Sequence, residues 1–266
     1  MKNGNVLVTG ASGGMGQATI KLLKAKGYNV YAIDKNIVTE DDVFFIQTDI
    51  TNIDEVKEAY NIILSKTDKL DAIIHFAGIY MLDSLIEIST ENFEKMFKVN
   101  IFGCFMINKI FFPLLDKHSK VIITTSELAP LDPLPFTGLY AITKSSLDKY
   151  AYSLCMELNL LDINVSVLRC GSVMTNLIND STVSLDNFCL KTKLYKCNAK
   201  RFKDIVNSVE AKSVSPDKIA QKVLKILDSP KPKFVYTLNR NLYLRLLSSL
   251  PKKLQLFIIK QILKTK

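Results

Sequence analysis

A tyrosine and a lysine four positions apart, Tyr140 and Lys144, form the clearest chemical pattern in this sequence. They fall near the start of a helix predicted over Gly138 to Leu160, so the phenol and the ammonium lie on one helix face. A neighbouring cation favours the phenolate and moves the pKa of a tyrosine from about 10 toward working pH. Tyr140 is therefore a candidate general acid/base for the interconversion of an alcohol and a carbonyl.

Hydroxyl and amide side chains that could assist this pair lie upstream of it. A strand predicted over Val121 to Thr125 ends in Thr124 and Thr125 and is followed directly by Ser126. A hydroxyl at this strand end could hydrogen-bond the substrate oxygen. Asn100 lies inside a long predicted helix, where a buried amide needs hydrogen-bond partners. These residues are candidates to orient the substrate and to complete the site.

A glycine-rich turn, Thr9 to Gly16, follows the first predicted strand and precedes a helix. Backbone N–H groups of such a turn can approach a pyrophosphate, and the helix N-terminus adds partial positive charge. Asp34 lies 24 residues after Gly10, at the end of the second predicted strand. A carboxylate there accepts hydrogen bonds from the ribose hydroxyls of an adenosine and repels a 2′-phosphate. The pattern predicts a nicotinamide dinucleotide site that favours NAD(H) over NADP(H).

Three further polar residues at strand ends bear on this site. Lys35 could soften the repulsion of a 2′-phosphate by Asp34. Asp49 has two compatible interpretations, an acceptor for the adenine amino group and a cap for the next helix. Asp54 is also a plausible N-cap of that helix. His75 lies within an apolar strand and has no partner nearby in sequence, so we interpret it as structural.

Apolar strands alternate with segments of helical period along most of the chain. Strands that are apolar on both faces and alternate with helices indicate a parallel sheet covered on both sides. We expect an α/β fold, one doubly wound domain of about seven parallel strands with helices on both faces. The predicted strands are Asn5 to Val8, Asn29 to Asp34, Val43 to Asp49, Ala72 to Phe76, Val121 to Thr125, Asn164 to Arg169 and Lys233 to Leu238. The predicted helices are Met15 to Lys26, Asp54 to Ser65, Asn92 to Leu115 (bent before Pro113), Gly138 to Leu160 and a helix from Ser215-Pro216-Asp217 to Asp228.

One stretch, 176–213, interrupts this alternation. It is polar, rich in Lys, Asn and Ser, and has weak helical periodicity. An ordinary surface insertion and a mobile lid over a substrate site both have this character. The two interpretations stay open at this point.

Length and composition exclude several classes of protein. The chain has 266 residues, 48% of them hydrophobic, which suits one large domain and excludes disorder. No uncharged apolar run approaches the roughly 18 to 20 residues that cross a bilayer, and the first ten residues resemble no signal peptide. We therefore expect a cytoplasmic protein. Five scattered cysteines and two histidines show no metal-ligand spacing, so we expect no metal site.

The net charge of +9 is confined to the end of the chain. No acidic residue follows Asp228, whereas nine of the 35 lysines and arginines do. A nucleic-acid enzyme would also carry basic residues around its site, so we expect no nucleic-acid partner. The pattern divides the chain into a domain over 1–240 and a basic amphipathic extension over 241–266.

This extension is predicted to form two short helices broken at Pro251. On the second, Lys253, Lys260 and Lys264 share one stripe, and apolar residues occupy a wide opposite face: Leu254, Ile258, Ile259, Ile262 and Leu263. Such a helix could lie on an anionic membrane surface or deliver a lipid-like substrate. It could equally pack on the body of the protein or on a second subunit, the alternative that we favour.

The motifs between about Asn5 and Thr175 together resemble the short-chain dehydrogenase/reductase family in its ordinary-length branch. They are TGxxxGxG at Thr9 to Gly16, the strand-end acids Asp34 and Asp49, Ala77-Gly78, Asn100, Ser126, Tyr140, Lys144 and the segment Gly171 to Thr175. Their order and intervals make the combination specific. The resemblance implies a Rossmann-type sheet and an enzyme that transfers a hydride between a nicotinamide cofactor and a substrate carbon.

The resemblance also implies a role for each matched residue. Tyr140 would exchange the proton, Ser126 would orient the substrate oxygen, and Lys144 would hold the nicotinamide ribose and lower the pKa of the tyrosine. Asn100 would keep a water that relays protons to bulk solvent. The cofactor would contact Gly10, Ser12, Gly13, Gly14, Met15, Gly16, Asp34, Asp49, Ile50, Ala77, Gly78, Asn100, Tyr140, Lys144, Gly171, Val173 and Thr175.

Three departures from the family pattern concern the site. The usual Asn-Asn-Ala-Gly is His75-Phe76-Ala77-Gly78, and the usual Pro-Gly is Cys170-Gly171. Ser126 precedes Tyr140 by 14 residues, where the family has 12 or 13. A loop longer by one residue would absorb this interval, with Thr125 as the weaker candidate for the serine's role.

The segment between Ser126 and Tyr140 is apolar and contains three prolines, which suits a hydrophobic alcohol or ketone. Together with the extension, it resembles hydroxysteroid and retinol dehydrogenase-like members of the family. We expect an NAD(H)-dependent oxidoreductase for such a substrate. We also expect a homo-oligomer, and the tail is a candidate for peripheral membrane contact. The alternatives are a ketoacyl-thioester or sugar ketone reductase, and a catalytically silent nucleotide-binding regulator.

Overall fold

A parallel sheet of seven strands, ordered β3-β2-β1-β4-β5-β6-β7, forms the centre of the molecule. The computed structural model describes residues 4–36, 43–210 and 213–264, with backbone alone for 176–182 and 208–210. The strands are β1 (Asn5–Thr9), β2 (Asn29–Asp34), β3 (Phe44–Gln47), β4 (Leu70–His75), β5 (Leu115–Ser126), β6 (Asn164–Cys170) and β7 (Val235–Leu238). The strand order reverses between β1 and β4, where a doubly wound sheet opens a crevice at its carboxyl edge.

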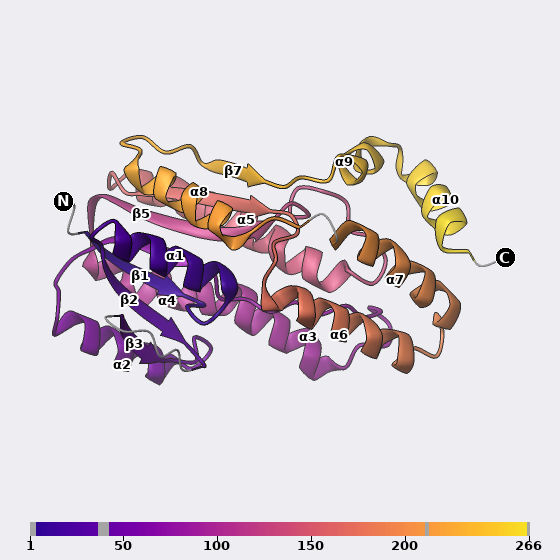
Figure 1. Ribbon diagram of the computed structural model, residues 1–266, viewed down its shortest axis with the longest axis horizontal. Helices are drawn as coiled ribbons and strands as arrows, with labels where there is room; N and C mark the ends of the chain where they lie inside the picture. Colours follow the sequence, from indigo (N-terminus) through magenta and orange to yellow (C-terminus); the bar gives the residue numbers. More distant parts are fainter. Residues whose placement is uncertain (1–3, 37–42, 211–212, 265–266) are drawn as a thin grey trace.

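Helices cover both faces of this sheet (Figure 1). On one face, α1 (Gly14–Ala25) packs beside α8 (Pro216–Asp228), and on the other lie α2 (Ile53–Leu64), α4 (Cys104–Phe111) and α5 (Gly138–Asn159). Central strands read as continuous apolar runs because both of their faces are buried: Leu7 joins one core and Val8 the other. The single α/β domain expected from the alternation is thus confirmed.

One helical run, Thr90–Leu114, changes its winding three times. It begins as α3 (Thr90–Phe97), passes through a π-helical segment η1 (Lys98–Gly103), continues as α4 and ends in the 3₁₀ turn η2 (Phe112–Leu114) at Pro113. By length and composition it could cross a membrane, and 44% of its most apolar window is buried. Met96, Ile107 and Phe111 are fully buried, so the run serves as a core helix.

The polar stretch 176–213 is helical where it is described, so the expectation of an irregular segment is wrong. It forms α6 (Asn176–Lys191) and α7 (Lys196–Glu210), joined by a short turn. Leu185 and Phe202 are buried in one cluster that also contains Leu82 and Leu263. The helical period was obscured because apolar residues lie on both sides of α6, with Leu185 and Phe188 buried and Val183 and Leu190 exposed.

The end of the chain forms α9 (Leu242–Ser249) and α10 (Lys252–Leu263), separated at Pro251 as predicted. Figure 1 shows α6, α7, α9 and α10 gathered beyond the carboxyl ends of the strands. Gln255 and Leu263 of α10 are buried, and α10 contacts α7, as in the packed alternative. The domain boundary at residue 240 stays a prediction.

Candidate active site

The glycine-rich turn between β1 and α1 is closely packed. Gly10 has a φ of 70°, and a Cβ there would lie 2.4 Å from the backbone N of Ala77. A Cβ on Gly16 would lie 2.3 Å from the backbone O of Gly10. Glycine is therefore required at both positions for the turn to lie against α1 and β4.

The N-terminus of α1 suits an anion. Gly13 occupies the N-cap position without a side-chain capping bond, and the first turn holds no acidic residue. The first backbone N–H groups of α1 therefore lack the side-chain acceptor that usually satisfies such groups. This chemistry fits a pyrophosphate, as the sequence predicted for Ser12, Gly13, Gly14 and Met15.

Asp34 ends β2 beside this turn. One carboxylate oxygen accepts a hydrogen bond from the backbone N of Ser12 (3.0 Å), and the other accepts one from the backbone N of Asn36 (2.9 Å). The carboxylate is thus held at the carboxyl edge of the sheet next to the phosphate turn. This position fits the predicted contact with an adenosine ribose.

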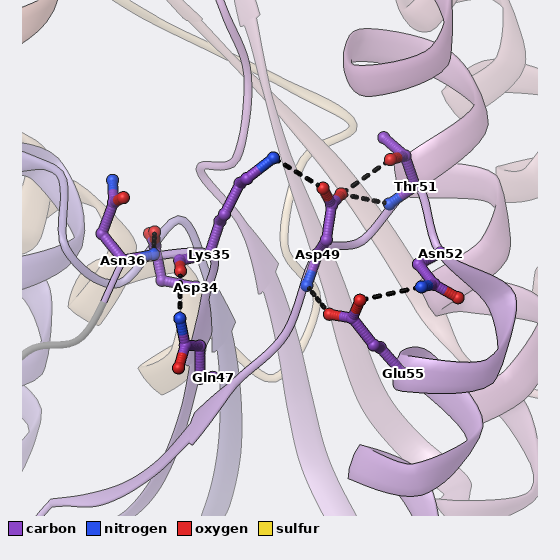
Figure 2. Close-up of polar contacts among 8 residues, drawn as sticks. All are labelled: Asp34, Lys35, Asn36, Gln47, Asp49, Thr51, Asn52 and Glu55. Atoms are coloured by element: carbon purple, nitrogen blue, oxygen red, sulfur yellow. Dashed lines mark hydrogen bonds and ion pairs between the residues drawn. The ribbon is translucent and has the colours of Figure 1, made fainter.

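The side chain of Lys35 extends toward Asp49. Its ammonium forms an ion pair with Asp49 (2.9 Å), as Figure 2 shows. Asp49 also accepts hydrogen bonds from the N–H and hydroxyl of Thr51. Partial burial would raise the pKa of Asp49, but the bonds from Thr51 and Lys35 outweigh it and lower the pKa. Lys35 thus pairs with Asp49, and its expected effect on the repulsion at Asp34 stays a prediction.

The cap of α2 is also different from the prediction. Asn52 accepts the hydrogen bond from the backbone N of Asp54 and is the N-cap, because the helix begins at Ile53. Asp49 closes the turn before the helix. The side chain of Ile50 is buried in the core, where it fills the space beside Gly103.

Tyr140, Ser126 and Lys144 meet at the carboxyl end of β5. The hydroxyl of Ser126 hydrogen-bonds the phenol of Tyr140, and the ammonium of Lys144 lies 5.8 Å from the tyrosine ring centre. Lys144 is only 6% exposed and donates a hydrogen bond to the backbone O of Thr124 (3.3 Å). The three side chains that the sequence assigned to proton exchange are therefore brought together.

Thr125 points away from this group. Its hydroxyl hydrogen-bonds the carboxylate of Asp148 (3.3 Å), which also pairs with Arg169. The structure therefore favours Ser126 over Thr125. In the loop between Ser126 and Tyr140, Phe136 adopts a φ of 66° and packs its ring against Phe188 and Phe202, and the accommodation of the longer interval by this loop stays a prediction.

Burial controls the ionisation of the tyrosine and the lysine. It lowers the pKa of Lys144 to about 8, because a low dielectric disfavours the ammonium. It raises the pKa of Tyr140, and the hydrogen bond with Ser126 offsets only part of this change. The expectation that the lysine alone moves the phenol toward working pH is therefore wrong for the protein without ligand.

Asn100 lies in the π-helical turn η1 and is 1% exposed. Its amide bonds the backbone N and O of Ile79 and the hydroxyl of Thr143. A Cβ on Gly78 would lie 3.2 Å from its amide oxygen and 3.5 Å from the Lys144 ammonium. Asn100 therefore fixes the loop after β4 against the lysine, which places it where the predicted proton relay would run.

The segment after β6 forms a second wall of the site. A Cβ on Gly171 would lie 1.9 Å from the backbone O of Asn239, so only glycine fits beside the chain that follows β7. Thr175 lies against Gly14: a Cβ added at Gly14 would be 3.0 Å from the methyl group of Thr175. Val173 bridges to Val214. The wall thus stands directly across from the phosphate turn.

Two buried hydroxyls in this region have no hydrogen-bond partner within the described part of the chain, those of Thr124 and Ser172. Both residues line the cavity beside Tyr140. Buried polar groups are normally satisfied, so these two indicate that a polar ligand belongs here. Residue types alone did not single out Ser172, since a lone serine in a loop carries no pattern.

The cavity has a volume of about 240 Å³ and extends from the phosphate turn to the C-terminal helices. Its walls are mostly apolar and include Met15, Leu128, Leu134, Phe202, Ile205 and Leu244. The ring of Tyr80 packs edge-on against Tyr140, with centres 4.6 Å apart. The sequence offered a lid over 176–213 and a role of the extension at the substrate site, but it did not identify the lining residues of α7 and α9, because these depend on long-range packing.

His75 plays the structural part expected from its sequence environment. It is 4% exposed, and its Nε2 hydrogen-bonds the amide oxygen of Asn108 (2.9 Å). Burial lowers the pKa of its imidazole to about 4, so the ring is neutral at pH 7.

Comparison with known proteins agrees with these geometrical features. The family model described as short chain dehydrogenase matches residues 4–184. A probable short-chain type dehydrogenase/reductase of Helicobacter pylori is 26% identical over 253 residues, which cover 92% of each chain. The 3-ketodihydrosphingosine reductase of Bacteroides thetaiotaomicron is 25% identical over 86% of this chain and 85% of its own. Mouse estradiol 17-beta-dehydrogenase 2 is 30% identical over 67% of this chain and 50% of its own.

Solved structures share the fold. A short chain dehydrogenase family protein from Francisella tularensis superposes with a TM-score of 0.74 at 22% identity, over 89% of this chain and 97% of its own. The 3-ketoacyl-(acyl-carrier-protein) reductase of Brucella melitensis, solved with NADH, gives a TM-score of 0.72 at 19% identity, over 89% and 96% of the two chains.

Proposed function

This chain belongs to the short-chain dehydrogenase family, and from that premise we propose that it is an NAD(H)-dependent oxidoreductase for a hydrophobic secondary alcohol and its ketone. The observation that carries this proposal is the buried group of Ser126, Tyr140 and Lys144 at the end of an apolar cavity. A phenol bonded to a hydroxyl, beside an ammonium, can give a proton to a carbonyl oxygen or take one from an alcohol.

The residues of the chain divide this work. Ser126 orients the substrate oxygen toward the Tyr140 phenol, which moves the proton. Lys144 supplies positive charge next to the phenol, and Asn100 holds the loop that packs against Lys144. A bound nicotinamide cofactor supplies the hydride acceptor or donor. The glycine turn, Asp34 and the wall from Gly171 to Thr175 would hold that cofactor.

The preference for NAD(H) follows from Asp34, whose carboxylate repels a 2′-phosphate while Lys35 is paired with Asp49. Replacing Asp34→Ala removes both the ribose acceptor and the repulsion. We expect the ratio of kcat/KM for NAD⁺ to that for NADP⁺ to fall about 10- to 100-fold, the range for losing a charged hydrogen bond. Steady-state kinetics with both cofactors measure this ratio. Glu58→Ala, at an exposed position on α2, is the control, and an unchanged ratio in Asp34→Ala would contradict the assignment.

The substrate class follows from the lining of the cavity. Apolar walls with a few polar groups at one end suit a hydrophobic molecule that bears one reacting oxygen. A hydroxysteroid- or retinol-like substrate is our first proposal. The named activities of relatives on estradiol and on 3-ketodihydrosphingosine support this class. A ketoacyl-thioester or sugar ketone reductase is the alternative within the enzyme class.

Absorbance at 340 nm with a panel of hydroxysteroids, retinol and simple secondary alcohols tests the chemistry. We expect turnover with NAD⁺ that falls about 10²- to 10⁴-fold in Tyr140→Phe, the usual contribution of a general acid/base. Tyr152→Phe, a half-exposed tyrosine on α5, is the matched control. Because burial raises the pKa of Tyr140, kcat/KM for oxidation should rise with pH through neutrality, whereas ketone reduction should be level there.

A different outcome would select another function. If NADH binds but no alcohol or ketone in the panel reacts, ketoacyl and sugar substrates come next. If those also fail, the silent nucleotide-binding regulator is favoured. The proposal further includes a cytoplasmic location and a homo-oligomeric assembly.

A further inference from the structure

Helices α9 and α10 leave a set of large apolar side chains in solvent, which we name the tail surface. Tyr243 is 79% exposed, Leu256 69% and Phe257 59%. Members of the tail surface are Leu242, Tyr243, Leu246, Leu254, Leu256 and Phe257. An accumulation of this kind on two short consecutive helices marks an interaction site more often than scattered single residues do.

These side chains are exposed although the helices themselves are held in place. Gln255 donates hydrogen bonds to Asp132 (2.9 Å) and to the backbone O of Leu250 (2.7 Å). Asn198 and Arg201 of α7 donate to backbone oxygens at the end of α10. The tail surface is therefore the unused side of a docked element, and packing on the body does not explain its composition.

The charged side chains of α9 and α10 are all basic, and Lys252 at the start of α10 pairs with Asp132 of the loop before α5. At 100° per residue, Lys253, Lys260 and Lys264 form a stripe that runs between Leu256 on one side and Phe257 and Leu254 on the other. No acidic residue follows Asp228 in the sequence. Basic side chains beside exposed Leu and Phe complement a surface that is anionic outside and apolar beneath, which is the chemistry of an anionic lipid bilayer.

The tail surface adjoins the entrance of the cavity. On α9, Leu244 lines the cavity while its neighbours Tyr243 and Leu246 point to solvent. On α7, Phe202 lines the same cavity, and α10 packs against α7. Helix α9 therefore carries both tail-surface residues and a residue of the cavity wall, and α10 is connected to the cavity through α7.

We propose that the tail surface docks the protein on anionic lipid bilayers, with Leu256, Phe257, Tyr243 and Leu246 entering the interface and the lysine stripe facing lipid phosphates. The docked protein presents the cavity mouth to the membrane, where a hydrophobic alcohol or ketone partitions. Only this link to the cavity rests on the proposed function; the docking itself does not.

Co-sedimentation of the full chain with vesicles tests the docking. We expect binding to vesicles of phosphatidylcholine with 40% phosphatidylglycerol, and little binding to pure phosphatidylcholine or at high salt. Leu256→Ser with Phe257→Ser should lose at least tenfold in partitioning. Lys253→Gln with Lys260→Gln should lose about 30-fold, from about 1 kcal/mol for each basic residue near an anionic surface.

Matched controls come from the far parts of the molecule. Leu160→Ser changes a leucine that is 82% exposed at the end of α5, and Lys21→Gln with Lys225→Gln removes two exposed charges from α1 and α8. Both controls should bind vesicles like the wild type. Circular dichroism and the unfolding temperature check that the tail variants remain folded, since their substitutions are at exposed positions.

Two results would overturn the proposal. The first is a wild-type chain that stays in the supernatant with anionic vesicles at low salt. The second concerns the tail variants. Either such a variant sediments with vesicles like the wild type, or it loses self-association in analytical ultracentrifugation, which would show that a second copy covers the tail surface. The vesicle experiment requires no turnover, so an inactive enzyme and an undocked enzyme give different results.

Discussion

Tyr140 and Lys144 share one site in which burial favours the neutral form of both groups. Burial raises the pKa of the phenol and lowers that of the ammonium to about 8. At pH 7 the phenol keeps its proton and the lysine keeps its charge. The unliganded site is thus prepared to donate a proton to a ketone, and alcohol oxidation must first remove that proton.

The effect of burial on the pKa of His75 can be tested by measuring the free energy of unfolding as a function of pH. Its pKa is about 4 in the folded chain and about 6.5 when exposed, so the unfolded state binds the extra proton between these values. The free energy of unfolding should fall as pH drops from 6.5 to 4, by up to about 3 kcal/mol. His75→Gln keeps a hydrogen-bonding group near Asn108 and should flatten this dependence in urea unfolding. His118→Asn, at an exposed position, is the control, and equal pH slopes in wild type and His75→Gln would refute the assignment.

The π-helical turn η1 shows how a local winding serves the site. Extra residues in a turn rotate the following helix and occur often at functional positions. Here the turn contains Asn100, whose amide satisfies both backbone groups of Ile79 and reaches Thr143 on α5. A single change of winding thus ties the loop after β4 to the helix that bears Tyr140 and Lys144.

Helix α7 lines the cavity, and Phe202 tests how firmly this helix is held. Its ring is 3% exposed, packs against Phe136 and lines the cavity. Phe202→Ala should lower the free energy of unfolding by about 3 to 5 kcal/mol, as expected for a buried aromatic ring. It should also raise KM for the hydrophobic substrate. Phe93→Ala, a partly exposed ring on α3, is the control; a loss below about 1 kcal/mol for Phe202→Ala would indicate a loosely attached insertion instead.

The molecule as a whole has a nearly neutral body and a basic end, and two regions of its surface carry a group of exposed apolar side chains. One is the tail surface. The other lies on α4, η2 and α5: Phe105 and Phe112 line a hollow of about 490 Å³, and Tyr152 and Met156 of α5 are exposed. Apolar groups on two adjacent parallel helices suit a symmetric contact with a second copy.

The proposed homo-oligomer therefore has a specific test. We expect a dimer or larger assembly of the wild type in analytical ultracentrifugation. The double variant Phe105→Glu with Met156→Glu should be a monomer, because a symmetric contact would bury these carboxylates opposite the same carboxylates of the second copy. Leu256→Ser with Phe257→Ser should leave the assembly unchanged. An oligomer that survives the first variant would place the contact elsewhere.

Much of the fold was predictable because it rests on local patterns. Alternation of apolar strands with helical segments indicated the doubly wound sheet, the spacing of glycines indicated the phosphate turn, and the spacing of Tyr140 and Lys144 placed both on one helix face. Pro251 correctly separated the last two helices. Each of these features depends on residues that are neighbours along the chain.

Other features depend on contacts between distant segments, which spacing does not encode. Thr125 and Ser126 are adjacent and chemically similar, and only the position of Asp148 turns one of them away from Tyr140. Lys35 could have served either carboxylate, and the turn before α2 brings Asp49 to it. Helix α6 becomes recognisable once its few apolar residues meet the loop before α5 and the end of α10. Periodicity reports which face of a segment is apolar, whereas the partner of that face is set by the packing of the complete chain.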